Sequence, residues 1–403
     1  METKPKNSRK TKNISNEISN TKKNNNIDLQ TEQYQTTQRY PKMIDRRIQQ
    51  LRFNMQDEKI EAAWITHLPN IRYLTNFSGS FATLLVTFDE LHFFTDDRYE
   101  EQIKTELFPV LNLVTHITRN PLETVIKNKL LKNISKIGIE SEYISFEDGL
   151  AVRSQANTQK VKMCAIQSLV EKYTQPKSPE EISNIKESCR IAELVYEKML
   201  GIIKPGITEV EIAAEISYQT RKLGSEGDAF DIICVAGSRS ALVHGSPTTA
   251  KVKKNDIVLM DFGCKINGFC SDISRTVCVG KPTAEQKKIY DILYNAMSAA
   301  IKEVRPAMRG NYLDAIARDL IKAEGYGENF QHSLGHGLGL VCHEKPIISF
   351  RLTDQIIPED VVLAIEPGIY LPNKFGMRVE DNILVTKTGA IKLTNAPSEL
   401  VCI

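Results

Sequence analysis

Two acidic residues flank a predicted β-hairpin, and their position favours metal binding. Asn-Gly at 267–268 is the strongest short-range signal for a two-residue hairpin turn, and in that register Asp261 lies opposite Ser274. Because residues two apart on a strand share a face, Asp261 and Asp272 are predicted to be diagonal neighbours, roughly 7–8 Å apart at the backbone. Residues 257–260 are apolar throughout, which predicts a buried strand. Buried carboxylates repel unless a cation joins them, so the pair predicts a metal site; two solvated acids on an exposed strand are the alternative.

Three of the seven histidines in the chain, His332, His336 and His343, lie within twelve residues. Glycines at 335, 337 and 339 let the backbone approach closely, which favours metal ligation or proton transfer over isolated structural histidines. The spacing matches neither the His-Glu-x-x-His zinc helix nor the Gly-x-Gly-x-x-Gly dinucleotide loop. The cluster therefore adds imidazole to the candidate site without matching either motif.

A third segment repeats the pattern of the first. Asp-Val-Val-Leu at 360–363 matches Asp-Ile-Val-Leu at 256–259, and each opens an apolar run that ends in an acid. In the third segment that acid is Glu366, and a second acid, Glu380, follows a glycine-containing connection. The repetition predicts an internal duplication whose acids converge. The alternative is that Arg378 and Glu380 form a surface ion pair.

The combined inventory of four carboxylates and one imidazole indicates the kind of metal. Oxygen-rich ligation with one nitrogen suits manganese, cobalt, iron or zinc better than a thiolate site does. Five ligands exceed what one tetrahedral zinc needs, so two adjacent metals are predicted. The eight cysteines contain no Cys-x-x-Cys pair, which disfavours a thiolate zinc site and predicts a reduced, intracellular chain.

Composition narrows the class of protein. The chain has 403 residues, 41% hydrophobic and 25% charged, as expected for a globular protein of two or three domains. No apolar run reaches the roughly 18 residues of a membrane span. Residues 1–40 carry a net charge of +4, which leaves 44 basic and 46 acidic residues elsewhere. This balance gives no bulk electrostatic reason to expect nucleic-acid binding.

The elements that must position these residues fall into three parts. Half of residues 1–40 are Asn, Gln, Ser or Thr, which predicts a disordered tail; a transit peptide is disfavoured by its four acids. Residues 41–172 alternate predicted strands and helices and indicate an α/β domain. A polar linker at 175–177 precedes an α+β domain at 178–403. Three capping boxes start its helices: Ser178 with Glu181, Thr208 with Glu211, and Thr283 with Gln286.

Local sequence patterns also predict helices and strands in the first ordered domain. Apolar residues at 44, 48, 51 and 55 predict a helix, and Asn120-Pro121 opens another that runs to about residue 131. Strands are predicted at 62–66, 82–88, 91–95 and 137–140.

With these motifs the sequence resembles the pita-bread metallopeptidases, a family that contains Xaa-Pro aminopeptidase, prolidase, methionine aminopeptidase and creatinase. The resemblance covers about residues 43–400. It implies an α+β fold with a C-terminal pita-bread catalytic domain and a smaller α/β creatinase-type N-terminal domain. The motifs are Ser-Ala-Leu-Val-His-Gly at 240–245, Met-Asp-Phe-Gly at 260–263, Ser-Asp-Ile-Ser-Arg-Thr at 271–276, Gly-His-Gly-Leu-Gly at 335–339, Glu-Pro-Gly-Ile-Tyr at 366–370 and Arg-Val-Glu-Asp at 378–381.

The resemblance also implies the roles of individual residues. Two divalent cations, manganese first and cobalt or zinc as alternatives, would be held by five ligands: Asp261, Asp272, His336, Glu366 and Glu380. Asp272 and Glu380 would bridge both metals. Substrate binding and proton handling would fall to His244, His332, His343 and Arg378. One departure is Val243, where proline is commoner.

The N-terminal domain narrows the implied activity. Residues 70–79 and 94–99 resemble the creatinase-type domain, which methionine aminopeptidases lack, and creatinase itself needs no metal. What remains is hydrolysis of the bond between an N-terminal residue and a following proline. A dipeptide-specific prolidase is the alternative, and a catalytically inactive binding homologue is a remote one. We expect a cytoplasmic homodimer that acts on proline-containing peptides.

The expected chemistry follows from the ligand set. Two cations would lower the pKa of a shared water enough to supply hydroxide near neutral pH, and this hydroxide would attack the carbonyl before proline. Glu366 is the candidate to accept the water proton. His343 is the candidate to stabilise the oxyanion or assist the leaving nitrogen, and His244 and Arg378 complete the expected catalytic set.

Overall fold

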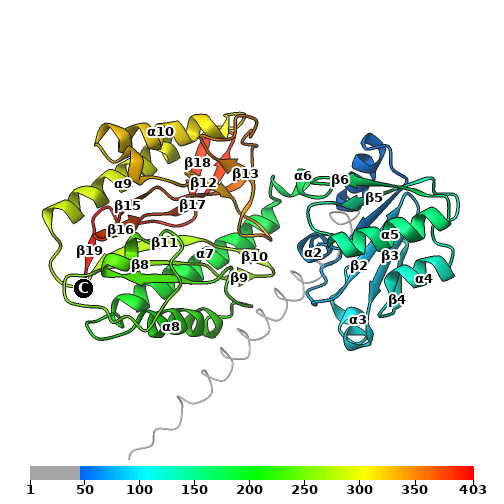
Figure 1. The fold of residues 1–403 in the computed structure, drawn as a ribbon, viewed down its shortest axis with the longest axis horizontal. Helices are drawn as coiled ribbons and strands as arrows, with labels where there is room; N and C mark the ends of the chain where they lie inside the picture. The colour runs from blue at the N-terminus through cyan, green and yellow to red at the C-terminus, as the bar shows by residue number, and fades with distance from the viewer. Residues whose placement is uncertain (1–45) are drawn as a thin grey trace, which may run out of the picture. The chain divides into compact units, whose positions relative to one another are not determined.

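The computed structural model describes residues 46–403, and the chain divides between Leu169 and Val170 into two compact units (Figure 1). The predicted disordered tail and the first apolar position of the first predicted helix, Ile44, lie outside the described residues. No helix of the described part of the chain is long and apolar enough to cross a membrane.

The N-terminal unit is built on one mixed six-stranded sheet, in the order β4-β3-β2-β1-β5-β6. Its strands are β1 (Ala62–Ile65), β2 (Thr83–Thr87), β3 (Leu91–Thr95), β4 (Leu113–Ile117), β5 (Lys136–Glu140) and β6 (Lys162–Ile166). Residues 46–57 are helical, and α2 (Leu68–Thr75), α3 (Ile103–Glu106), α4 (Pro121–Lys127) and α5 (Phe146–Thr158) follow. The predicted strands are confirmed. The helix after Asn120 is shorter than predicted, because Lys129 takes the left-handed conformation (φ 56°) that ends helices.

The C-terminal unit places paired helices against two sheets. Helices α7 (Pro179–Leu200) and α8 (Glu209–Lys222) pack on the sheet β19-β11-β8-β7, and α9 (Ala284–Glu303) and α10 (Gly310–Ala323) pack on β13-β12-β14-β17-β18 (Figure 1). All three predicted capping boxes are confirmed, at the starts of α7, α8 and α9. The strands of the first sheet are β7 (Ile233–Ala236), β8 (Ile257–Phe262), β11 (Ile273–Cys278) and β19 (Val401–Cys402). Those of the second are β12 (Gly335–Gly337), β13 (Glu344–Ile348), β14 (Val362–Ile365), β17 (Asp381–Thr386) and β18 (Gly389–Lys392).

The predicted duplication is visible in the order of these elements. In each half two helices precede an antiparallel strand pair, β8 with β11 and then β14 with β17. Each pair is interrupted by a small hairpin: β9 (Lys265–Ile266) with β10 (Phe269–Cys270), and β15 (Gly368–Leu371) with β16 (Phe375–Arg378). The predicted acids therefore sit at equivalent places, where each strand pair meets its hairpin.

The first hairpin has the predicted register. Ser274 pairs with Asp261, and the turn residues Asn267 and Gly268 both have positive φ (49° and 82°), as a type I′ turn requires. Strand β8 is buried over its whole length, so the prediction of a buried strand is confirmed.

The predicted polar linker at 175–177 is packed against the C-terminal unit instead. Pro176 forms a bridge with Val361, and the backbone N–H of Lys177 donates to the carbonyl of Asp360 at 2.7 Å. The Lys177 side chain is only 2% exposed because Glu344 supplies a buried carboxylate partner. That partner lies 167 residues along the chain, so a composition-based boundary could not reveal it.

Candidate metal centre

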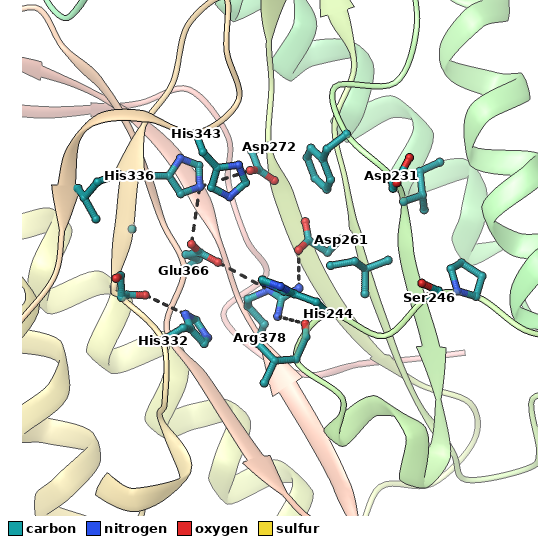
Figure 2. Close-up of a pocket in the computed structure, with 18 residues that line it drawn as sticks. Asp231, His244, Ser246, Asp261, Asp272, His332, His336, His343, Glu366 and Arg378 are labelled. Carbon is teal, nitrogen blue, oxygen red and sulfur yellow. Dashed lines mark hydrogen bonds and ion pairs between the residues drawn. The ribbon is translucent and has the colours of Figure 1, made fainter. Parts of the chain in front are cut away.

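Eight of the nine predicted site residues line one cavity of about 770 Å³ in the C-terminal unit. The ninth, Glu380, lies buried beside it, and ligand atoms of Glu380, Asp261 and Asp272 all lie within 4.8 Å of one another. Figure 2 shows His336 between the carboxylates of Asp272 and Glu366, with its Nε2 3.6 Å from an oxygen of each. The two halves of the duplicated unit thus bring their acids together, as the repeated sequence pattern predicts.

The strand pairs decide where each acid lies. Asp261 belongs to β8, and Asp272 immediately precedes its partner β11. In the second half Glu366 follows β14, and Glu380 immediately precedes β17. His336 comes from the middle of β12, which is the neighbour of β14. Neighbouring strand ends therefore present four carboxylates and one imidazole to one point.

Unpartnered buried atoms test whether these residues fit a cation. Among the described residues, the buried side-chain atoms without a hydrogen-bond partner include Asp261 Oδ1, Asp272 Oδ1, His336 Nε2 and both carboxylate oxygens of Glu380. Leaving such groups unpaired in the interior is costly, so they call for a partner that supplies positive charge. The donor set of carboxylate oxygens with one imidazole nitrogen fits divalent cations such as manganese.

The imidazole of His336 is held in the state that a metal ligand needs. Its Nδ1 faces the carbonyl of Gly337 at 3.0 Å, and because a carbonyl only accepts, Nδ1 carries the proton. The Nε2 lone pair then points at carboxylate oxygens of Asp272 and Glu366, each 3.6 Å away. Burial lowers the pKa of His336 to about 3, so the ring is neutral at physiological pH.

Burial and mutual repulsion hold protons on the acids when no cation is bound. Burial raises the pKa of Asp272 well above its usual range, and the charges of Glu380, Asp261 and Glu366 add to this. The pKa of Glu380 is raised for the same reasons, and burial raises the pKa of Glu366 to about 8. This cost is what bound cations would relieve.

The metal-free protein is therefore expected to lose stability as the pH rises from 7 to about 8.5. The folded state keeps a proton on Glu366 until about pH 8, whereas the unfolded chain has already released it. Because the folded state binds more protons, the free energy of unfolding falls as the pH rises. His332 and His336, whose pKa values are lowered, are mostly neutral in both states above pH 7 and add little slope. One pKa unit corresponds to about 1.4 kcal/mol, so we expect Tm to fall by at least about 3 °C.

Thermal unfolding in the presence of a chelator measures this effect. Added manganese should flatten the dependence, and Glu366→Gln should reduce it because the amide does not titrate. A Tm that is constant or rises over this pH range in the chelated wild-type protein would contradict the prediction.

Arg378 is buried and forms hydrogen bonds to several residues of the site. Its side chain is 1% exposed and Glu380 is equally buried, so the alternative of a surface ion pair is wrong. Its Nε donates to Ser274 Oγ at 2.7 Å, its Nη2 to Asp261, and its Nη1 to the carbonyl of Val243 at 3.2 Å. Only the backbone of Val243 takes part, so valine at this position leaves the contact intact.

Tyr370 is a site residue to which the sequence interpretation gave no role. Its hydroxyl oxygen accepts from Arg378 Nη1 at 2.6 Å and lies 2.9 Å from Nε2 of His332. Nδ1 of His332 faces the carbonyl of Ser333 at 2.8 Å and carries the proton, so Nε2 accepts from Tyr370. Burial lowers the pKa of His332 to about 3. The position of Tyr370, four residues after Glu366, is the only sequence signal that could have indicated these hydrogen bonds.

His343 and His244 are exposed in the cavity. The ring of His343 stacks on that of His336, with 4.0 Å between centroids, and burial lowers its pKa. Ring nitrogens of His336 and His343 and an oxygen of Asp272 also lie within 4.8 Å of one another, so His343 is within reach of a cation. The neighbouring thiol of Cys342 donates to Asp272 at 3.2 Å, a contact that no sequence pattern indicated.

Comparisons with known proteins agree with this geometry. The family described as "Metallopeptidase family M24" matches residues 183–387, and the "Creatinase/Prolidase N-terminal domain" matches residues 47–173. The Xaa-Pro dipeptidase of Pyrococcus furiosus is 34% identical over 88% of this chain and 99% of its own length.

Two solved structures have the same fold over most of the chain. An Xaa-Pro dipeptidase from Bacillus anthracis is 34% identical, with a TM-score of 0.84 over 89% of this chain and 100% of that one. An X-Pro aminopeptidase from Thermotoga maritima is 34% identical, with a TM-score of 0.82 over 88% of this chain and 99% of that one.

Proposed function

Because the chain belongs to metallopeptidase family M24, we propose that it removes the N-terminal residue from peptides whose second residue is proline. The predicted fold, a pita-bread catalytic domain preceded by a creatinase-type domain, is confirmed. Metal dependence and hydrolysis of proline peptides are thus the expected activity, and the open choice is between an aminopeptidase and a dipeptidase. The homodimer and the cytoplasmic location stay predictions.

Five residues are proposed to hold two divalent cations, with manganese as the first candidate: Asp261, Asp272, His336, Glu366 and Glu380. The unpartnered buried oxygens and the free Nε2 of His336 support this proposal. When bound, the cations would lower the pKa of a water and polarise the peptide carbonyl.

The remaining roles rest on what the side chains can donate or accept. Among the described residues, the nearest side-chain nitrogens to the Glu366 carboxylate are the unprotonated Nε2 of His336 at 3.6 Å and Nε of Arg378 at 3.9 Å, so the carboxylate can accept the proton of the attacking water. His343 is exposed in the cavity with a lowered pKa, so its neutral ring can donate an N–H to the developing oxyanion. Arg378 would fix the orientation of Asp261, and His332, held by Tyr370, would bind substrate beside it.

The state of Arg378 favours the aminopeptidase over the dipeptidase. It is the only Lys or Arg among the described residues that line the cavity. Its guanidinium already donates four of its five N–H groups, to Ser274, Val243, Tyr370 and Asp261. A dipeptide ends in a carboxylate directly after proline, and the described residues that line the cavity offer no Lys or Arg free of other partners to pair with it. A longer peptide places an uncharged amide there and needs none.

We therefore expect a longer peptide to be preferred over a dipeptide. The metal-loaded protein should show kcat/KM at least about 10-fold higher for Gly-Pro-Gly than for Gly-Pro, since an unpaired polar group in a binding site costs roughly 1–3 kcal/mol and an unpaired charge costs more. Gly-Pro amide is the matched control, because it has the size of Gly-Pro without the charge, and it should behave like the tripeptide. A preference for Gly-Pro would establish the prolidase alternative, and no turnover of either would establish the inactive homologue.

A further inference from the structure

The ion pair between Lys177 and Glu344 joins two residues that do not line the cavity and have no proposed chemical role. Their side chains are 2% and 10% exposed, and Nζ of Lys177 lies 2.5 Å from Oε1 of Glu344. The ammonium also donates to the carbonyls of Thr174 and Gln175, so all three of its N–H donors are used. A buried pair of this kind contributes little net stability, but removing one partner alone leaves an unpaired buried charge and is costly.

What the pair holds is the peptide that carries His343. Glu344 is the next residue along, at the start of β13, where it pairs with Gly337 of β12. Glu344 points toward Lys177, whereas His343, in the bend just before β13, lines the cavity. Gly339 makes room for this contact, since a Cβ there would lie 2.5 Å from Oε2 of Glu344.

Lys177 is itself fixed to the strand that leads to the metal site. Its backbone N–H donates to the carbonyl of Asp360, and the preceding Pro176 bridges Val361, immediately before β14. Strand β14 ends beside Glu366. Lys177 therefore joins the strand before Glu366 to the peptide that carries His343.

We propose that Lys177, acting through Glu344, is a positioning residue that holds His343 in place for catalysis. This inference rests on the role proposed above for His343. Lys177 touches neither the cavity nor a candidate ligand, so its loss should lower turnover without removing metal. A displacement of about 1 Å in a catalytic group can cost up to about 10²-fold in rate.

A double-mutant comparison in the full-length, metal-loaded protein tests the proposal. The variants are Lys177→Met and the charge-free pair Lys177→Met with Glu344→Gln, which leaves no unpaired buried charge and so keeps the test valid if the single variant fails to fold. Each is made in the wild-type and in the His343→Ala background. The readouts are kcat on Gly-Pro-Gly and metal content by elemental analysis. Lys288→Met, which breaks the exposed pair with Glu324, is the control for loss of a lysine charge and should leave both unchanged.

We expect both variants to lower kcat by about 10-fold or more in the wild-type background. In the His343→Ala background the same changes should alter kcat less than about 2-fold, because the group they position is gone. Equal losses in both backgrounds, a loss of metal, or no loss in either background would overturn the inference. If His343→Ala by itself keeps wild-type kcat, the role proposed for His343 is wrong. This result is known before any Lys177 variant is made, so it is distinct from a failure of the Lys177 proposal.

Discussion

Asp272→Asn is expected to remove both cations and to lower kcat by at least about 10³-fold. A ligand atom of Asp272 lies within 4.8 Å of those of Asp261 and Glu380 in one group and of those of His336 and His343 in another. Replacing its carboxylate removes a negative charge and an oxygen ligand from the centre of the group. Bound divalent metal lowers the pKa of water from about 15.7 to about 7, so about 10³-fold is a lower bound on what its loss costs.

Unfolding should not explain this loss of activity. Burial and three neighbouring carboxylates raise the pKa of Asp272, so a neutral amide relieves repulsion in the metal-free protein. The Tm measured in chelator should therefore stay level or rise. Metal content by elemental analysis and kcat on Gly-Pro-Gly complete the measurement.

Two controls separate metal loss from other effects. Wild-type protein stripped by exhaustive chelation should become inactive and recover when manganese or cobalt is added, whereas Asp272→Asn should not recover. Asp319→Asn makes the same chemical change on an exposed position of α10 and should leave activity unchanged. An Asp272→Asn protein that holds two metals and keeps a tenth or more of wild-type kcat would refute the assignment, as would full activity in stripped wild-type protein.

His343→Ala is expected to lower kcat by about 10²–10⁴-fold while both metals stay bound. The ring is exposed in the cavity beside His336, and its lowered pKa leaves it neutral and able to donate an N–H. Loss of this donor removes stabilisation of the transition state and leaves the five proposed ligands in place. Elemental analysis and kcat on the tripeptide measure the two quantities separately.

Three outcomes distinguish the roles that His343 could have. Metal loss in His343→Ala would make it a ligand, which its place within 4.8 Å of Asp272 and His336 allows. Wild-type kcat with lower stability would make it a packing residue beside Phe230, whose ring it contacts edge-on. His116→Ala, in the N-terminal unit, controls for loss of a partly buried imidazole and should leave kcat unchanged.

Local patterns in the sequence determined the elements that build the site. The Asn-Gly turn at 267–268 was sufficient to predict the register in which Asp261 faces Ser274, because a two-residue turn leaves only one pairing. The apolar run before Asp261 was sufficient to predict a buried strand, and capping boxes such as Ser178 with Glu181 to predict helix starts. Each of these signals acts over a few residues, so it is readable without knowledge of the fold. The proposed set of five ligands came from the resemblance to known metallopeptidases.

The tertiary structure alone decided which partners these residues meet. Tyr370 joins Arg378 to His332 across 38 residues, Cys342 donates to Asp272 across 70, and Lys177 meets Glu344 across 167. The polar run at 175–177 read as a linker because local composition carries no information about a carboxylate supplied by a distant segment. Contacts of this kind form only when the C-terminal unit packs as a whole. Their geometry depends on that packing, which short-range hydrogen bonding and side-chain alternation do not encode.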